Sequence, residues 1–329
     1  MFANIAAIAL LAGILGAAFY QNAMQECRKM PPLGNQHGKV MIVTGGNSGL
    51  GFETSKSLAA AGATVVMGCR SADRGQRARE EILRTHPAAD ISVMQLDLAS
   101  FKSIRRFADE FSLKYGRLDV LVNNAGIMAL PERELTEDGF EAQVGTNHVG
   151  HFLLTALLFP ILSTNARVIN HSSEMHRSMV SSFPPEGMQA VDSYSPWGTY
   201  GNSKGANLLF TYEFNHRLAA AGNPRNIISV AVHPGYSSTN LQLGRFPMAT
   251  QINALFAMPA ADGALAQVYA AGGDGITKSD NNYFGPKYSF FGAPAVTSTD
   301  SKTWDRQRQQ FLWEESLRLI GANKCFVAT

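Results

Sequence analysis

Tyr200 and Lys204 are the two side chains whose types and spacing most directly suggest catalysis. They lie four positions apart in the run Tyr-Gly-Asn-Ser-Lys, so on a helix they share one face. A nearby ammonium group favours a phenolate and lowers the pKa of a tyrosine, which makes its hydroxyl more useful as a general acid or base. Because this spacing also occurs by chance on exposed helices, its meaning depends on the elements that position it.

Apolar runs alternate with amphipathic stretches along most of the chain. Strands are predicted at residues 39–44, 63–69, 91–96, 118–123, 166–171 and 227–232, and helices at 50–61, 72–84, 100–114, 140–162 and 200–220. This alternation predicts an α/β fold, a doubly wound, Rossmann-like parallel sheet with helices on both faces. Past Gly235 the pattern loosens, and we expect a substrate lid and C-terminal additions there.

A glycine-rich turn follows the first predicted strand and precedes a predicted helix. It runs from Thr44 to Gly51 with the spacing TGxxxGxG rather than GxGxxG. Glycines let a backbone turn tightly and approach a pyrophosphate, which lies at the helix N-terminus. The residues predicted to bind a dinucleotide are Gly45, Asn47, Ser48, Gly49, Leu50 and Gly51. The alternative is a tight turn without a ligand.

Arg70 follows the second predicted strand, at the place where an acidic residue would bind the ribose hydroxyls of NAD. A guanidinium there favours the 2′-phosphate of NADP(H), which is therefore the predicted cofactor. Arg74 could assist. The alternatives are that Arg70 is a solvated surface residue and that Arg74 simply faces water.

In their order and spacing, these motifs resemble the short-chain dehydrogenase/reductase family over residues 38–320. The matching stretches are the glycine turn, Asn-Asn-Ala-Gly at 123–126, Asn147, the serine pair at 172–173, the Tyr200 motif and His-Pro-Gly at 233–235. Within this family, the chain resembles the retinol dehydrogenase-like branch. The resemblance lies in residues 145–152, 168–173 and 311–316 and in the long interval from Ser173 to Tyr200. Protochlorophyllide reductases share the 311–316 resemblance, but they typically depart from the Asn-Asn-Ala-Gly motif that is intact here.

The resemblance implies a role for each matching residue. Tyr200 would exchange a proton with the carbonyl or alcohol oxygen, and Lys204 would lower its pKa and hold the nicotinamide ribose. Ser173 would hydrogen-bond the substrate oxygen, and Asn147 would support a water and proton relay to Lys204. Further cofactor contacts are implied for Asp97, Leu98, Asn124, Ala125, Gly126, Pro234, Gly235 and Thr239. Alternatively, Asn147 is satisfied locally and Ser173 caps a strand end.

The N-terminus differs from the rest because residues 2–20 carry no charge. This is about the length of a membrane-spanning helix, so residues 1–22 are predicted to be a single-pass anchor, with a cleaved signal segment as the alternative. Arg28 and Lys29 follow the span, which places the large domain in the cytosol. The resemblance implies the endoplasmic reticulum. Residues 23–37 are expected to be a linker, and 38–329 a single domain.

The composition excludes several classes of partner. A net charge of +2 without long basic runs indicates no nucleic acid, and three scattered cysteines indicate neither a metal site nor a disulfide framework. His148, His151, His171 and His176 are expected to be structural or at a pocket rim. A lid at residues 237–259, rich in Met and Phe, suits an apolar carbonyl or alcohol such as a retinoid, sterol or lipid aldehyde. The alternatives are a protochlorophyllide-type reductase and a non-catalytic nucleotide-binding scaffold, and a homodimer is one option.

Overall fold

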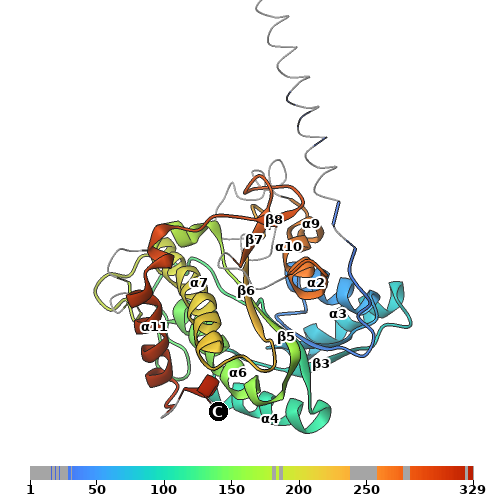
Figure 1. The fold of residues 1–329 in the computed structure, drawn as a ribbon, viewed down its shortest axis with the longest axis horizontal. Coiled ribbons are helices and arrows are strands. Elements are labelled where there is room, and N and C mark those ends of the chain that lie inside the picture. Colours follow the sequence, from blue (N-terminus) through green and yellow to red (C-terminus); the bar gives the residue numbers. More distant parts are fainter. Residues whose placement is uncertain are drawn as a thin grey trace, which may run out of the picture.

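An eight-stranded sheet forms the centre of the computed structural model (Figure 1). The structure describes residues 16, 19, 22, 29–30, 32–179, 183–184, 188–237, 258–276, 282–322 and 325–328. The strand order is β3-β2-β1-β4-β5-β6-β7-β8. The strands are β1 Val40–Thr44, β2 Thr64–Cys69, β3 Ile91–Gln95, β4 Leu118–Asn123, β5 Leu162–His171, β6 Ile228–Val232, β7 Tyr283–Pro286 and β8 Pro294–Val296.

All pairings from β3 to β7 are parallel, and β8 pairs with β7 antiparallel. The predicted doubly wound parallel sheet is therefore confirmed for its first six strands. Two differences were not predicted. β5 begins at Leu162 rather than at residue 166, and the β7–β8 hairpin extends the sheet beyond β6.

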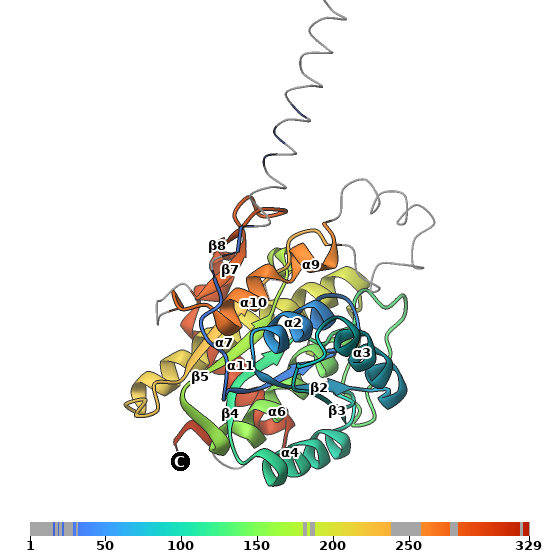
Figure 2. The same ribbon diagram turned by 90° about the vertical axis from the view of Figure 1, so that its right-hand side faces the viewer.

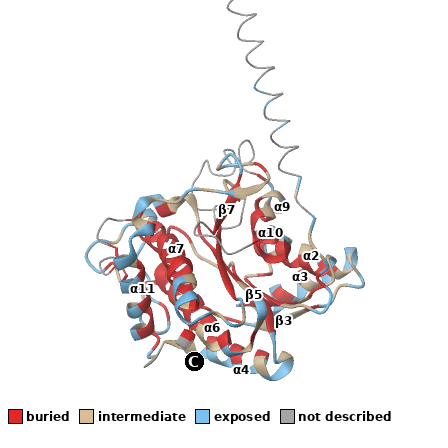
Figure 3. Ribbon diagram, viewed as in Figure 1, coloured by how far each residue is buried: buried red, intermediate tan, exposed pale blue. Residues whose placement is uncertain are grey.

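Helices cover both faces of the sheet (Figures 1 and 2). One face carries α4 Phe101–Tyr115, α6 Gly150–Leu158, α7 Pro196–Ala220 and α11 Arg306–Leu319, and the other carries α2 Gly49–Ala60, α3 Ala72–Thr85, α9 Ala260–Gly263 and α10 Leu265–Gly272. Successive side chains of β1 point to opposite faces of the sheet. Ile42 packs against the helices of the first face, whereas Met41 and Val43 pack against those of the second. The buried residues accordingly form two layers, one on each side of the strands (Figure 3).

The long helix predicted at 140–162 is interrupted by a wider turn. It consists of α5 Ala142–Val144, the π-helix η1 Gly145–Val149, α6, and the 3-10 turn η2 Phe159–Ile161. π-turns inside helices are often found at functional sites. This one carries Asn147. Three further 3-10 turns are described: η3 Glu174–Ser178, η4 Ser301–Trp304 and η5 Phe326–Ala328.

The expected membrane anchor, residues 1–22, lies almost entirely outside the described residues and stays a prediction. Among the residues that are described, one helical stretch, Ala142–Ile161, is long and apolar enough to cross a membrane, and 72% of it is buried inside the domain. Its hydrophobicity is therefore explained by packing in the core. Part of the expected linker also packs on the domain: Leu33 pairs with Gly273, and the Gln36 amide donates to the Gly272 carbonyl at 2.9 Å.

Candidate active site

The turn between β1 and α2 takes its shape from glycines. Gly45 and Gly49 have φ angles of 68° and 55°, a region that residues with a Cβ rarely occupy. Gly51 allows a close approach, because a Cβ at this position would lie 2.4 Å from the Gly45 carbonyl oxygen. The first backbone N–H groups of α2, which have no partners within the helix, therefore lie directly at the turn.

Thr44 ties this turn to the segment that follows β4. Its hydroxyl accepts hydrogen bonds from the backbone N–H groups of Asn124 and Ala125, both at 2.9 Å. In return, the Asn124 side-chain amide donates to the Thr44 carbonyl at 2.8 Å. The ring nitrogen Nε2 of His151 lies 2.9 Å from the same hydroxyl. These bonds fix two loops at the carboxyl edge of the sheet.

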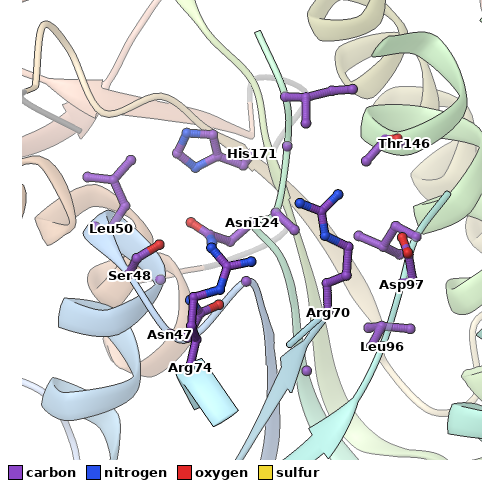
Figure 4. A pocket seen from close by; sticks show the side chains of 18 of the residues that line it. Asn47, Ser48, Leu50, Arg70, Arg74, Leu96, Asp97, Asn124, Thr146 and His171 are labelled. Carbon is purple, nitrogen blue, oxygen red and sulfur yellow. The ribbon is translucent and has the colours of Figure 1, made fainter. Parts of the chain in front are cut away.

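A cavity of about 420 Å³ lies at this edge (Figure 4). The sequence predicted fourteen of its lining residues as site residues: Gly45, Asn47, Ser48, Gly49, Leu50, Gly51, Arg70, Asp97, Leu98, Asn124, Ala125, Gly126, Tyr200 and Lys204. The cavity extends from the glycine turn to the Tyr–Lys pair. It therefore joins the predicted nucleotide turn and the predicted catalytic residues in one space.

Other lining residues were not predicted as cofactor contacts, namely Gly68, Leu96, Ile127 and Thr146. Thr146 lies on the π-turn one residue before Asn147, and the stretch at 145–152 was the available signal for it. Gly68 and Leu96 follow from strand register, because they lie at or just after the carboxyl ends of β2 and β3, and Ile127 lies in the loop that follows β4. Sequence spacing alone does not show that these backbones face the cavity.

Arg70 and Arg74 extend toward the cavity from the end of β2 and the first turn of α3 (Figure 4). Both side chains are exposed, so a ligand could reach them. Among the described residues that line the cavity, Asp97 is the one carboxylate, and its Oδ1 accepts the Ala99 N–H at 3.0 Å. The charge at the end of β2 is thus positive.

Tyr200 lies in the second turn of α7, with its hydroxyl near the Ser173 side chain. The helix begins at Pro196 behind a Ser195 cap, so the predicted start at residue 200 was one turn too late. Burial raises the pKa of Tyr200 to about 12, and the nearby Ser173 side chain offsets part of that rise. The lowering predicted from Lys204 is not among the causes of this shift, and burial dominates because a phenolate is poorly solvated there.

Lys204 lies one turn beyond Tyr200 and is buried, with 3% of its surface exposed. Its Nζ donates to the His171 carbonyl at 3.1 Å and lies 5.6 Å from the centre of the Tyr200 ring. Burial lowers the pKa of Lys204 to about 7, because an ammonium loses its hydration in this position. The lysine can therefore change its charge near neutral pH.

Ser173 and Asn147 both have local partners as well. The Ser173 hydroxyl accepts the Met175 N–H at 3.2 Å and so caps η3. The Asn147 side chain accepts the Ile127 N–H at 2.8 Å and donates to the Ile127 carbonyl and the Ser203 hydroxyl, each at 2.9 Å. Asn147 thus holds the segment beside Gly126, and its relay role stays a prediction.

The buried histidines have structural partners, and His171 also lines the cavity. His171 Nδ1 lies 2.8 Å from Gln267 Oε1, and His148 Nε2 lies 2.8 Å from Ser316 Oγ. Burial lowers the pKa of His171 to about 3 and that of His148 to about 4. Within the described part of the chain, no three His, Cys, Asp or Glu side chains are placed to hold a metal ion.

Among the predicted cofactor residues that the structure describes, Pro234 and Gly235 are not among those lining the cavity. Pro234 and Gly235 lie beyond the end of β6, and Gly235 is so close to the β7–β8 hairpin that a Cβ there would lie 2.5 Å from the Phe290 carbonyl oxygen. Thr239 falls outside the described residues. The same is true of residues 238–257, which are most of the expected lid.

The sheet order, the glycine turn and the Tyr–Ser–Lys group together define a nicotinamide-dependent oxidoreductase with a Rossmann-like fold. A sequence model of the short chain dehydrogenase family matches residues 39–249, and the chain belongs to that family. It is 36% identical to human (Homo sapiens) retinol dehydrogenase 12 over 288 residues, covering 86% of this chain and 87% of that protein. The resemblance to the retinol dehydrogenase-like branch is therefore confirmed.

Solved structures support the same fold. The chain is 38% identical to an uncharacterised protein from Mycobacterium paratuberculosis, with a TM-score of 0.74 over 90% of this chain and 97% of that one. It is 25% identical to a blue fluorescent protein from a metagenomic library, whose crystal structure is a complex with NADPH. That match has a TM-score of 0.61 and covers 78% of this chain and 99% of the other.

Proposed function

We propose that this protein is a membrane-anchored, NADP(H)-dependent oxidoreductase that interconverts an apolar carbonyl compound and its alcohol. The observation that carries the proposal is the placement of Tyr200 beside Lys204, with Ser173 nearby, at one end of a cavity whose other end is the glycine turn. A proton donor, a hydrogen-bond donor and a titratable lysine thus meet where a dinucleotide would end.

The side chains divide the work at the substrate oxygen. Tyr200 would give a proton to this oxygen during reduction or take one during oxidation, as a general acid or base. The Ser173 hydroxyl would donate a hydrogen bond to the same atom and stabilise the charge that develops there. Lys204, able to titrate near neutral pH, would hold the nicotinamide ribose and balance the charge of Tyr200. When bound, the nicotinamide supplies or accepts the hydride.

The lining of the cavity fits a phosphorylated dinucleotide. The positive-φ glycines shape a turn whose backbone N–H groups would face a pyrophosphate. Arg70 and Arg74 would hold a 2′-phosphate, because guanidinium groups bind phosphate through several hydrogen bonds. Asp97 and Leu98 would contact the adenine end. The preference for NADP(H) over NAD(H) rests on the two arginines.

Apolar side chains near Tyr200 support an apolar substrate. Met128, Ala129 and Tyr200 form a small buried cluster, and Met175 packs against it. The Trp197 ring lies 6.3 Å from the Tyr200 ring and is 38% exposed. The retinol dehydrogenases among the relatives suggest a retinoid-like molecule. With the uncharged stretch at 2–20 as an anchor, the domain would face the cytosol at the endoplasmic reticulum.

Replacing Tyr200 with Phe tests the catalytic proposal. We expect a fall in kcat of about 100-fold to 10,000-fold, the range typical of a lost general acid, with NADPH binding retained. Tyr212→Phe is the matched control, because Tyr212 is buried on the same helix but does not line the cavity. Wild-type protein that binds NADPH yet reduces none of a broad panel of apolar aldehydes and ketones would instead favour a non-catalytic scaffold.

Replacing Arg70 with Ala tests the cofactor. Loss of a charge-assisted hydrogen bond to phosphate should weaken NADPH binding by roughly 10-fold to 100-fold and leave NADH binding nearly unchanged. Arg77→Ala on α3 is the control, because Arg77 is exposed on the same helix as Arg74 and does not line the cavity. Fluorescence titration of both nucleotides measures the effect. Equal affinity of the wild type for NADPH and NADH would overturn the preference.

A further inference from the structure

The tip of the β7–β8 hairpin, residues 287–293, presents aromatic side chains to the outside of the molecule. Tyr288 is 42% exposed and Phe290 59% exposed, although both are large apolar side chains. The tip is an ordered turn: the Lys287 N–H donates to the Ala293 carbonyl at 2.9 Å, and the Tyr288 N–H donates to the Phe291 carbonyl at 3.0 Å. Its aromatic groups are therefore held outward by backbone hydrogen bonds.

The charge of the hairpin is suited to an anionic lipid surface. Residues 282–299 contain no Asp or Glu, and Lys287 is their one charged side chain. Its Nζ lies 5.4 Å from the centre of the Tyr288 ring. Aromatic rings with an adjacent cation are the combination that favours the interface between lipid headgroups and hydrocarbon.

Phe19 places the hairpin relative to the expected anchor. Its ring lies 6.4 Å from Tyr288 and 6.5 Å from Phe291. Phe19 is at the carboxyl end of the uncharged stretch 2–20. If that stretch spans the bilayer, its last residues lie at the cytosolic surface of the hydrocarbon layer. The hairpin tip, beside them, then lies at the same depth.

We propose that the β7–β8 tip is a second membrane contact that inserts Tyr288 and Phe290 into the bilayer surface beside the anchor. This rests on the proposed function for the anchor and for the apolar substrate. The tip also contacts the residue just before the expected lid, because the Tyr236 N–H donates to the Phe290 carbonyl at 3.3 Å. Seating the tip in lipid would therefore hold the substrate side of the enzyme against the membrane, from which an apolar substrate could enter directly.

Brominated lipids test the insertion in the full-length protein. Phe290→Trp adds one indole at the tip. In vesicles of phosphatidylcholine and phosphatidylserine, the fluorescence that the variant emits beyond that of the wild type comes from this indole. We expect bromine on the acyl chains to quench this added fluorescence. Phe311→Trp is the control, because Phe311 is 42% exposed on α11, away from the hairpin (Figure 1), and should not be quenched. An indole at the tip that stays unquenched in vesicle-bound protein would overturn the proposal.

A second measurement uses activity. The Tyr288→Asp/Phe290→Asp variant should lose several-fold in kcat/KM for an apolar aldehyde held in vesicles and keep its kcat/KM for a small water-soluble aldehyde. Leu113→Asp, at a position 89% exposed on α4, should change neither.

Quenching without turnover of any aldehyde would sink the enzymatic proposal alone. Failure of the wild type to sediment with vesicles would overturn both the anchor and the tip contact. The fluorescence of the added indole could instead depend on the number of protein molecules per vesicle and not on bromine. That result would overturn the lipid contact and assign the tip to a contact with a second copy of the chain.

Discussion

Lys204 is the residue at which burial affects the proposed chemistry most directly. Its ammonium group is removed from water, and the pKa near 7 is the result of that burial. The Nζ keeps a backbone carbonyl as its partner. A small change of pH therefore decides whether a positive charge stands beside Tyr200.

NADPH affinity should fall as the pH rises from 7 to 9. Deprotonation of Lys204 removes a cation that would donate a charge-assisted hydrogen bond to the ribose, and losing such a bond weakens binding by about tenfold. Titrations of the wild type and of Lys204→Gln measure this, and the variant should bind weakly with little pH dependence. Lys56→Gln, whose lysine pairs with Glu53 on α2, should behave as wild type. Constant wild-type affinity across this range would show that the lysine charge does not contribute.

At the residue scale, the sequence predicted which side chains lie together better than it predicted their pKa values. The spacing of Tyr200 and Lys204 and the position of Ser173 at a strand end were enough to predict that these three side chains lie near one another. The sequence also predicted that the lysine would lower the pKa of Tyr200, whereas burial raises it to about 12. Burial depends on packing by distant segments, so four-residue spacing carries no information about it.

The packing of η3 against α7 positions Ser173 beside Tyr200. Gly201 and Gly205 lie on the contacting face of α7, and Cβ atoms there would lie 2.2 Å from Ser178 Oγ and 2.4 Å from Met179 Sδ. The absent side chains let η3, which begins directly after Ser173, lie against the helix. The distance between the two elements is thus set by two glycines outside the predicted site.

Gly201→Ala should separate these elements. Overpacking typically costs about 1–3 kcal/mol of stability, and displacement of Ser173 should lower kcat roughly tenfold to 100-fold. Gly198→Ala is the matched control, because a Cβ there meets only Ser195 at the ordinary distance of 3.4 Å. It should stabilise the protein by up to about 1 kcal/mol without changing kcat. Thermal unfolding and turnover are measured on both variants, and equal kcat values would contradict this account.

Local signals account for which elements were predicted. The first six strands are short apolar runs with turn residues at their ends, and they were found. The Ser195–Pro196 pair is a recognised helix start that would have given the correct beginning of α7. The π-turn at Gly145–Val149 and the four-residue strand β7 have no such signal, because the first depends on helix packing and the second on pairing with β6.

Four buried histidines connect distant parts of the molecule. His148 bonds Ser316 on α11, His151 bonds Thr44 on β1, His171 bonds Gln267 on α10, and His233 lies 3.4 Å from Glu174 on η3. Burial lowers the pKa values of His148 and His233 to about 4 and those of His151 and His171 to about 3. The folded protein therefore holds all four in the neutral form at neutral pH.

Acid should destabilise the whole domain through these side chains. In the unfolded chain a histidine titrates near 6.5, so below that pH the unfolded state binds more protons than the folded state. Their contribution to stability is complete above about pH 6.5 and is lost as the pH falls toward 4 and 3, with a slope of up to about 5 kcal/mol per pH unit for four protons. Urea unfolding of the full chain in detergent between pH 7 and 4 measures this slope.

His148→Gln keeps a hydrogen-bonding group near Ser316 and removes one titratable side chain. The slope of its unfolding free energy against pH should therefore be smaller by about 1.4 kcal/mol per pH unit. A free energy of unfolding that stays constant from pH 7 to 5, or a His148→Gln slope equal to that of the wild type, would show that the buried histidines do not control acid stability.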